Sequence, residues 1–478
     1  MAEDLKRKTK VGLYWSFTNQ VATLGMQFVV GIVMARILTP SDYGITALPA
    51  AFMSIAQVFI ESGFSSALVR KPELKQEDLS TAFYYSFMVG VLCYIIMFFA
   101  APFIADFYHE PVLIKLVRIS SLVFIWSPLN TPQNVILQRK LDFKTPARIA
   151  IINKLISGAL GILAAYKGFG LWALVIANLT SSILGFIQTW IAVKWVPKAE
   201  WSKDSFKYLW GYGNKLVATH LVKSIFSNIG SILMGKMSGT ANLGYYDRAK
   251  GYANIPSANI TGVITSVTFP VLSKFQHDDD LLRRNYIKMI RVSSFVIFPV
   301  MMLLAALAHP LIIIMLTDKW EYSAYLLQII CFTYMWQPVQ ILNLNVLQVK
   351  GRPDLTLKLE MIKRPLSLAM AIVGLSISVE AFCYADLLFT FIALVLNTYY
   401  TKKLVDVGLI KQIKDLLPVL LLSLSMFVLV LFMTKLFDNL YLQVLIGGFV
   451  GVAYYLIVAI LFKFKELPDV LYLLKIKK

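Results

Sequence analysis

The sequence contains few charged residues and no long hydrophilic segment. Only 15% of its 478 residues are charged, whereas 58% are hydrophobic. Soluble domains are closer to half apolar and a quarter charged. Apolar runs, many of them 20 or more residues long, recur from Val11 to Phe464, and a helix of about 20 residues crosses a hydrocarbon core of ~30 Å. We therefore expect an all-α, polytopic membrane protein and not a single water-soluble core.

Signatures of catalysis and of metal binding are missing as well. The sequence has only three cysteines, Cys93, Cys331 and Cys383, each inside an apolar run and without metal-ligand spacing. It contains no P-loop, no nucleophile elbow and no zincin motif. The longest loop, around residues 194–207, is short and basic. We expect a protein that is not an enzyme and needs no cofactor or metal.

Charged residues and Pro/Gly breaks divide the apolar runs into candidate transmembrane spans. We predict about fourteen: 11–36, 42–69, 79–105, 112–137, 145–166, 169–193, 208–235, 243–273, 286–308, 321–348, 355–376, 380–401, 413–434 and 440–462.

Positive charge is concentrated in alternate loops. Of the 46 lysines and arginines, 31 fall in one set of loops and termini, and 5 in the opposite set. Basic loops remain in the cytoplasm, so we predict that both termini are cytoplasmic. The net charge of +19 is then an orientation signal and an attraction to anionic membrane lipids. Nucleic acid is not an expected partner.

A hairpin near the start of the chain recurs 200 residues later. The first copy covers residues 31–44 and the second 231–244. At this offset Ile32 matches Ile232, Met34 matches Met234, and Gly44 matches Gly244. The repeat predicts a molecule built from two related halves.

Polar side chains recur at helical spacing within several predicted spans, so that each set projects from one side of its helix. The sets are Ser54, Gln57, Glu61 and Ser65 in the second span; Lys215, His220 and Lys223 in the seventh; and Arg248, Tyr252, Asn259 and Ser266 in the eighth. One interpretation is helix packing through hydrogen bonds. The other is a wet, cationic cavity, because a charge at mid-bilayer is costly unless it faces water or a partner. Such a cavity suits an anionic substrate such as a pyrophosphate or an acidic sugar.

The acidic residues within the spans have two interpretations. Glu61 is isolated, so it either titrates as a coupling group for protons or sodium or pairs with a cation on another helix. Glu360 precedes Lys363 and Arg364 by three and four residues, which favours local ion pairs.

Two stretches resemble a known family of transporters. The segments ARILTPSDYG (35–44) and ESGFSSALVRK (61–71) resemble the opening signature of Wzx-type polysaccharide flippases of the multidrug/oligosaccharidyl-lipid/polysaccharide superfamily. The segments LGYYDRA (243–249) and FPVLSK (269–274), with Pro256 between them, resemble the second-half signature of the colanic acid exporter type.

This resemblance implies two six-helix lobes related by a pseudo-two-fold axis, residues 1–200 and 201–408, followed by two further helices and a basic tail in 409–478. It implies alternating access and export of an undecaprenyl-pyrophosphate-linked oligosaccharide from the cytoplasmic to the periplasmic leaflet of a bacterial inner membrane, for lipopolysaccharide, capsule or exopolysaccharide synthesis. Arg248 lies within the matched motif and is the first candidate for the substrate anion. The other candidates are Lys215, Lys223, Tyr252 and Asn259.

The repeated hairpin is then expected at the periplasmic rim. There Arg36 and Asp42, with the matching Lys236, have a gating or structural role, while Glu61 is the candidate coupling group. The lipid II flippases of the superfamily carry arginines in the first helix. The predicted first span, 11–36, has none before Arg36, so their binding scheme is not transferred.

Two alternatives remain open on the sequence. A cation-coupled small-molecule exporter of the same superfamily would share the fold. A membrane-bound glycan polymerase or ligase would need a large periplasmic loop, which the sequence lacks.

Overall fold

The computed structural model describes residues 2–61 and 64–475. Within that range it does not describe the side chains of residues 2–14, 16, 17, 212, 215, 216, 218, 219, 223, 267 and 471–475. Every element assigned in the described residues is a helix. The chain forms two compact units, Met1–Gly244 and Tyr245–Lys478, which are described separately.

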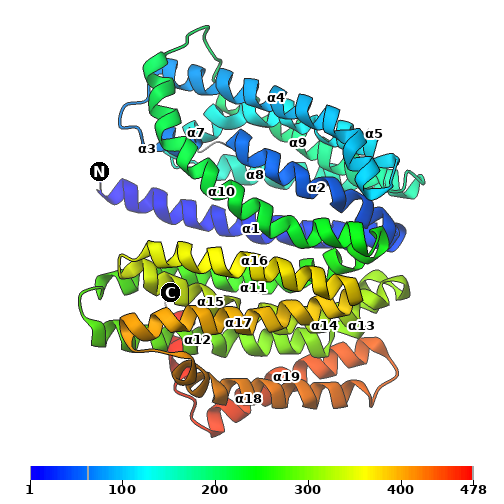
Figure 1. Cartoon of the computed structure of the whole chain (residues 1–478), viewed down its shortest axis with the longest axis vertical. Coiled ribbons are helices and arrows are strands. Elements are labelled where there is room, and N and C mark those ends of the chain that lie inside the picture. Colours follow the sequence, from blue (N-terminus) through cyan, green and yellow to red (C-terminus); the bar gives the residue numbers. More distant parts are fainter. Residues whose placement is uncertain (1, 62–63, 476–478) are drawn as a thin grey trace. The chain divides into compact units, whose positions relative to one another are not determined.

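The first unit contains the ten α-helices α1 to α10, one 3₁₀ segment and the start of α11. Figure 1 shows the course of these helices. The elements are α1 (Ala2–Ile37), α2 (Pro40–Glu61), α3 (Phe64–Arg70), α4 (Gln76–Tyr108), α5 (Val112–Ser120), α6 (Val123–Trp126), η1 (Ser127–Asn130), α7 (Thr131–Arg139), α8 (Lys144–Tyr166), α9 (Trp172–Val193) and α10 (Lys203–Met237).

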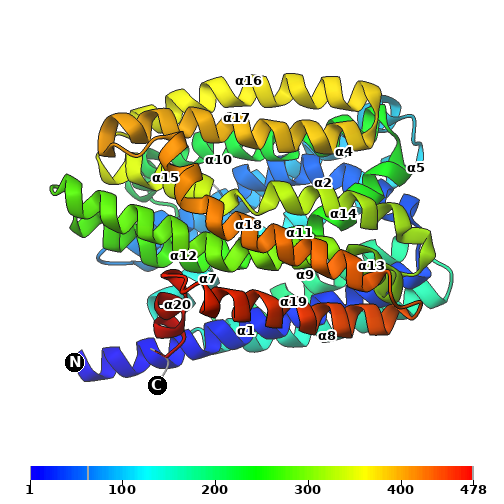
Figure 2. The same cartoon turned by 90° about the horizontal axis from the view of Figure 1, so that it is seen from below.

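The second unit contains the rest of α11 and the helices that follow it. In Figure 2, α16 and α17 lie side by side along their length, and these two helices pack directly on each other. The elements are α11 (Thr240–Lys274), α12 (Asp279–Ala306), α13 (Ala308–Leu316), η2 (Asp318–Trp320), α14 (Glu321–Tyr334), α15 (Gln337–Val349), α16 (Pro353–Ile377), α17 (Val379–Val405), α18 (Leu409–Thr434), α19 (Leu440–Leu461) and α20 (Glu466–Lys475).

The helical, multi-pass membrane class is confirmed. Eleven helices in the described part of the chain are long and apolar enough to cross a membrane. The segments over α10, α13–α15 and α16 coincide with predicted spans but are not among these eleven. The number fourteen therefore stays a prediction.

The boundary between the units differs in position from the predicted lobe boundary at residue 200. Helix α10 packs on α2, α3 and α4 and lies in the first unit. The division into lobes at residues 200 and 408 stays a prediction.

Short polar side chains fix the starts of several helices. Ser202 accepts a hydrogen bond from the amide of Ser205 at the start of α10 (3.2 Å). Ser378 accepts one from Ala381 at the start of α17 (3.0 Å). These caps satisfy amide donors that have no partner inside the helix. The sharp ends of these long helices therefore follow from the sequence.

A buried polar cluster ties four helices of the second unit together. Asn343 of α15 accepts hydrogen bonds from Tyr286 of α12 (2.8 Å) and Gln412 of α18 (2.9 Å). Thr401 of α17 is 3.4 Å from the same oxygen. All four side chains are buried, and amide hydrogen bonds between membrane helices stabilise their packing.

Candidate functional site

The site is built around α2, whose start is fixed by a capping box. Asp42 Oδ2 accepts hydrogen bonds from the amide and the hydroxyl of Thr39 (2.9 and 2.7 Å), and the Asp42 amide donates to the Thr39 hydroxyl (3.2 Å). This reciprocal pattern satisfies donors at the helix start. Asp42 thus holds the α1–α2 turn, and its proposed gating role stays a prediction.

The two copies of the repeated hairpin meet within the first unit. A Cβ added to Gly44 would lie 1.7 Å from the carbonyl oxygen of Thr240, and a Cβ added to Gly244 would lie 1.9 Å from that of Pro40. The hydroxyls of Ser41 and Thr240 are 3.2 Å apart. Glycine is required at both positions because backbone, not a movable side chain, occupies the space.

A polar cavity of about 630 Å³ lies beside the second half of α2. All four polar residues predicted for one face of the second span line it: Ser54, Gln57 and Glu61 of α2, and Ser65 of α3. Helix α10 contributes His220 of its predicted set together with Ser224, Ser227 and Asn228, which are not in that set. The segments η1 and α7 contribute Ser127, Thr131, Asn134 and Gln138. The structure thus brings the polar faces of two predicted spans into one cavity.

Hydrogen bonds fasten α2 to α10 at one edge of this cavity. Asn228 of α10 donates to the hydroxyl of Ser54 on α2 (2.8 Å), and the hydroxyls of Ser54 and Ser224 are 3.5 Å apart. Both interpretations of the polar sets therefore apply. Some of the polar side chains hold helices together by hydrogen bonds, and the others line the cavity.

Glu61 is exposed in this cavity and ends α2. Its carboxylate accepts a hydrogen bond from Gln57 one turn earlier (3.2 Å). Among the described side chains, no cation lies within salt-bridge distance of it, and no second acid lines the cavity with it. The described lining is therefore neutral to acidic, where the sequence suggested a cationic wall. The predicted site residues Lys215 and Lys223 lie outside the described side chains.

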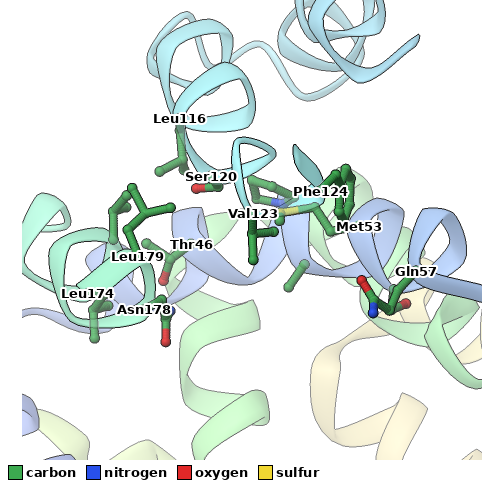
Figure 3. A pocket seen from close by; sticks show the side chains of 14 residues that line it. Thr46, Met53, Gln57, Leu116, Ser120, Val123, Phe124, Leu174, Asn178 and Leu179 are labelled. Atoms are coloured by element: carbon green, nitrogen blue, oxygen red, sulfur yellow. The ribbon is translucent and has the colours of Figure 1, made fainter. Parts of the chain in front are cut away.

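A second cavity, of about 370 Å³, lies between α2, α5–α6 and α9 (Figure 3). Its polar groups are all uncharged: Thr46, Ser54, Gln57, Ser120 and Asn178. Phe124, Val123, Leu174 and Leu179 supply apolar surface around them. Ser54 and Gln57 line both cavities, so polar space continues along α2.

The wall formed by η1 and α7 does not follow from the hydropathy pattern, which predicts a single span over residues 112–137. The structure breaks this segment into α5, α6, η1 and α7. Pro128 and Pro132 were the available signal, because proline removes a backbone donor and interrupts a helix. The break places Ser127 and Thr131 against the cavity.

The predicted site residues of α11 do not line the cavities described above. Arg248 is half-buried and hydrogen-bonds to Tyr252 one turn later. The Asn259 amide donates to the carbonyl of Ile255 (2.6 Å). A role for these three residues in substrate binding stays a prediction.

The local ion pairs of α16 are confirmed. Glu360 lies 2.6 Å from the Lys363 ammonium and 2.7 Å from the Arg364 guanidinium. One carboxylate thus pairs with both cations of its own helix, as their spacing predicted, and leaves a net charge of +1.

The arrangement of the helices defines the class of protein. The fold is similar to the solved structure of the lipid II flippase MurJ in an inward closed conformation, with a TM-score of 0.73 and 18% identity over 95% of this chain and 99% of that one. It is also similar to an inward-facing multidrug resistance MATE family transporter, with a TM-score of 0.58 and 15% identity over 80% of this chain and 98% of that one. The chain therefore shares the fold of these two solved structures.

The sequence comparisons then give the family. A model described as "Polysaccharide biosynthesis protein" matches residues 33–325, and the chain belongs to this family. It is 25% identical to the teichuronic acid biosynthesis protein TuaB of Bacillus subtilis, over 72% of each chain. It is 23% identical to the lipopolysaccharide biosynthesis protein WzxC of Escherichia coli, over 77% of this chain and 76% of that one. The resemblance deduced from the two sequence signatures is confirmed.

Proposed function

We propose that this protein translocates an undecaprenyl-pyrophosphate-linked oligosaccharide across a bacterial inner membrane, for the synthesis of a surface polysaccharide. The observation that carries the proposal is the polar cavity between α2, α7 and α10 inside a membrane-spanning helical unit. Hydroxyl and amide groups dominate its lining, and these groups bind the hydroxyls of sugars by hydrogen bonds. The family match and the relative WzxC support the same function.

The topology belongs to the same proposal. With the basic loops in the cytoplasm, both termini are cytoplasmic, and the Arg36–Gly44 turn faces the periplasm. Alternating access then exposes the cavity first to one leaflet and then to the other.

Deletion of the protein tests the proposed function. We expect cells without it to accumulate the lipid-linked oligosaccharide on the cytoplasmic side, where a membrane-impermeant periplasmic glycosidase or lectin does not reach it. Unchanged surface glycan together with lost efflux of small organic cations would contradict the proposal and favour a small-molecule exporter.

Glu61 is the proposed coupling residue, because it is a membrane-embedded carboxylate exposed in the cavity. We expect Glu61→Gln to keep a hydrogen bond to Gln57, now between two uncharged amides. Transport by this variant should no longer depend on the ion gradient. The measurement is flipping in proteoliposomes with and without an imposed proton or sodium gradient. The matched control is Ser65→Ala, which alters the same cavity wall without removing a charge. Normal gradient dependence in Glu61→Gln would exclude the coupling role.

Arg248 is the proposed contact for the substrate anion. We expect Arg248→Ala to reduce surface polysaccharide at least about tenfold, since a charge-assisted hydrogen bond to phosphate contributes at least about 1.4 kcal/mol. Arg248→Lys should keep part of the activity because it keeps the charge. The readout is polysaccharide per molecule of membrane-inserted protein. Arg364→Ala is the control, because that cation is paired with Glu360. Full export by Arg248→Ala would contradict the proposal.

A further inference from the structure

A hydrocarbon-lined groove of about 520 Å³ runs between α2 and α4. Helix α2 contributes Phe52, Ile55, Ala56 and Phe59, which lie on the side of α2 opposite to Ser54, Gln57 and Glu61. None of the lining side chains carries a charge, hydroxyl or amide. Helix α2 thus has a polar face, which suits the hydroxyls of a sugar, and an apolar face, which suits a lipid chain.

The groove extends over about two thirds of the thickness of a bilayer's hydrocarbon core. Its α4 residues recur at helical spacing from Cys93 to Phe107, which is about 21 Å of helix at ~1.5 Å per residue. The hydrocarbon core of a bilayer is about 30 Å thick. Several residues of the α4 wall, among them Ile96 (56% exposed) and Phe103 (78% exposed), are open to the surroundings of the unit.

Aromatic side chains close one end of the groove, on the side of the α1–α2 and α10–α11 turns. Tyr108 packs edge-on against Phe52 and Phe107, with ring centroids 6.3 and 4.8 Å apart. Its hydroxyl donates to the carbonyl of Ile232 on α10 (3.4 Å). The groove is therefore tied to α10 at this end.

Lys236 stands at the closed end. Its ammonium is 5.0 Å from the centroid of the Phe107 ring, donates to the Phe107 carbonyl (2.6 Å) and is 3.1 Å from Nε2 of His109. Lys236 is exposed. Asp106 and Glu110 are the sequence neighbours of Phe107 and His109. Even so, among the described residues no carboxylate lies within salt-bridge distance of the Lys236 ammonium. An ammonium has three donors, so at least one is available to a ligand.

We infer that the groove and Lys236 together form a binding site for a single-chain polyprenyl phosphate lipid, with the chain between α2 and α4 and the phosphate at Lys236. The charge is complementary, since the lining of the groove is uncharged and the ammonium of Lys236 lies at one end of it. The inference rests on the proposed function. In the proposed topology the phosphate lies on the periplasmic side, so the site would hold the lipid in the receiving leaflet, after translocation.

Site-specific photocrosslinking tests the inference. Benzophenone-alanine is placed at Ile96 in the groove or at Leu155 on α8, in protein reconstituted into phosphatidylcholine nanodiscs containing undecaprenyl phosphate. Leu155 is a matched control, because it is 57% exposed and Ile96 is 56% exposed. The two positions also lie at similar depths, since Leu155 is 11 residues before the end of α8 and Ile96 is 12 residues before the end of α4. The α8–α9 turn lies on the same side of the unit as the α1–α2 turn, because Gly170 is close to the carboxylate of Asp42.

We expect about tenfold more undecaprenyl phosphate adduct from Ile96 than from Leu155, and a decrease of similar size in Lys236→Gln. Ala100→Phe, which fills the groove, should also abolish the preference, while thermal unfolding confirms that both variants fold. Equal adduct at the two positions would show surrounding lipid only and would overturn the inference. So would competition by phosphatidylglycerol as effective as that by undecaprenyl phosphate, or full labelling in Lys236→Gln.

This test measures binding and requires no transport. Its failure would leave the proposed flippase function intact. Failure of that function would appear separately, in cells that lack the protein and still export their glycan.

Discussion

Replacing Gly44 with alanine is expected to abolish transport and to destabilise the protein by about 3 kcal/mol or more, at or above the upper end for overpacked sites. The new methyl carbon would lie 1.7 Å from the carbonyl oxygen of Thr240 and 3.2 Å from the amide nitrogen of Gly244. Both atoms belong to the backbone of the second hairpin, so rotation of a side chain does not relieve the clash. The two hairpins must therefore separate. Thermal unfolding in detergent and surface polysaccharide in cells measure the two effects.

Gly262→Ala is the matched control. Gly262 is also a helical glycine in a predicted span, but nothing lies within 4 Å of an added Cβ. Alanine there should be neutral or stabilising by up to about 1 kcal/mol, because it restricts the unfolded chain. If Gly44→Ala and Gly262→Ala unfold at the same temperature, the close approach of the hairpins is wrong.

Replacing Asp78 with alanine should produce the second large effect, a loss of about 2–4 kcal/mol of stability. Asp78 is 1% exposed. Its carboxylate accepts hydrogen bonds from the Lys71 ammonium (2.6 Å), the Ser205 hydroxyl (2.5 Å) and the Lys75 amide (2.9 Å). Alanine leaves the partly buried Lys71 charge and the buried Ser205 hydroxyl without this acceptor, and removes the carboxylate that accepts the Lys75 amide at the start of α4.

The Asp78 change should also impair transport. The loop before α10 is held on α4 by hydrogen bonds from the Lys198 amide to Ser80 (3.1 Å) and from the Ser202 amide to Thr81 (3.0 Å). The hydrogen bond from Ser205 to Asp78 is a further contact between α10 and α4. Loss of Asp78 should therefore loosen the start of α10, the helix that lines the polar cavity. Limited proteolysis of residues 194–205 reports this loosening.

Asp280→Ala is the control for this charge. Asp280 pairs with Arg283 at 2.5 Å, but its side chain is 72% exposed. An exposed ion pair contributes only about 0–1 kcal/mol. Equal losses of stability in Asp78→Ala and Asp280→Ala would contradict the account of the buried carboxylate.

The fold class was readily predictable, because hydrophobic length alone distinguishes a multi-pass membrane protein. The fine division of the helices was not. Residues 308–349 form α13, η2, α14 and α15; hydropathy does not show where a helix breaks, whereas Pro338, in the first turn of α15, does mark one break.

The α2 face of the candidate site was predictable from the spacing of Ser54, Gln57 and Glu61, since helical periodicity fixes which residues share a face. Their partners on α7 were not, because periodicity within one helix does not indicate which other helix lies opposite. The positive charge expected at this site stays a prediction, because the side chains of Lys215 and Lys223 lie outside those that the structure describes. Many lysines and arginines belong to loops that orient the chain, and Lys236 caps the end of α4 at the Phe107 carbonyl.

The contact between the hairpins has the form of an isologous interface. In a C2 dimer, residue i contacts j and j contacts i; here Gly44 meets Thr240 while Gly244 meets Pro40, and each pair is related to the other by the same offset of 200 residues. A single polypeptide thus carries a self-complementary surface of the kind that joins identical subunits. If residues 240–244 were replaced by a second copy of residues 40–44, both glycines would be kept. The two hairpins could then still approach each other at both contact points.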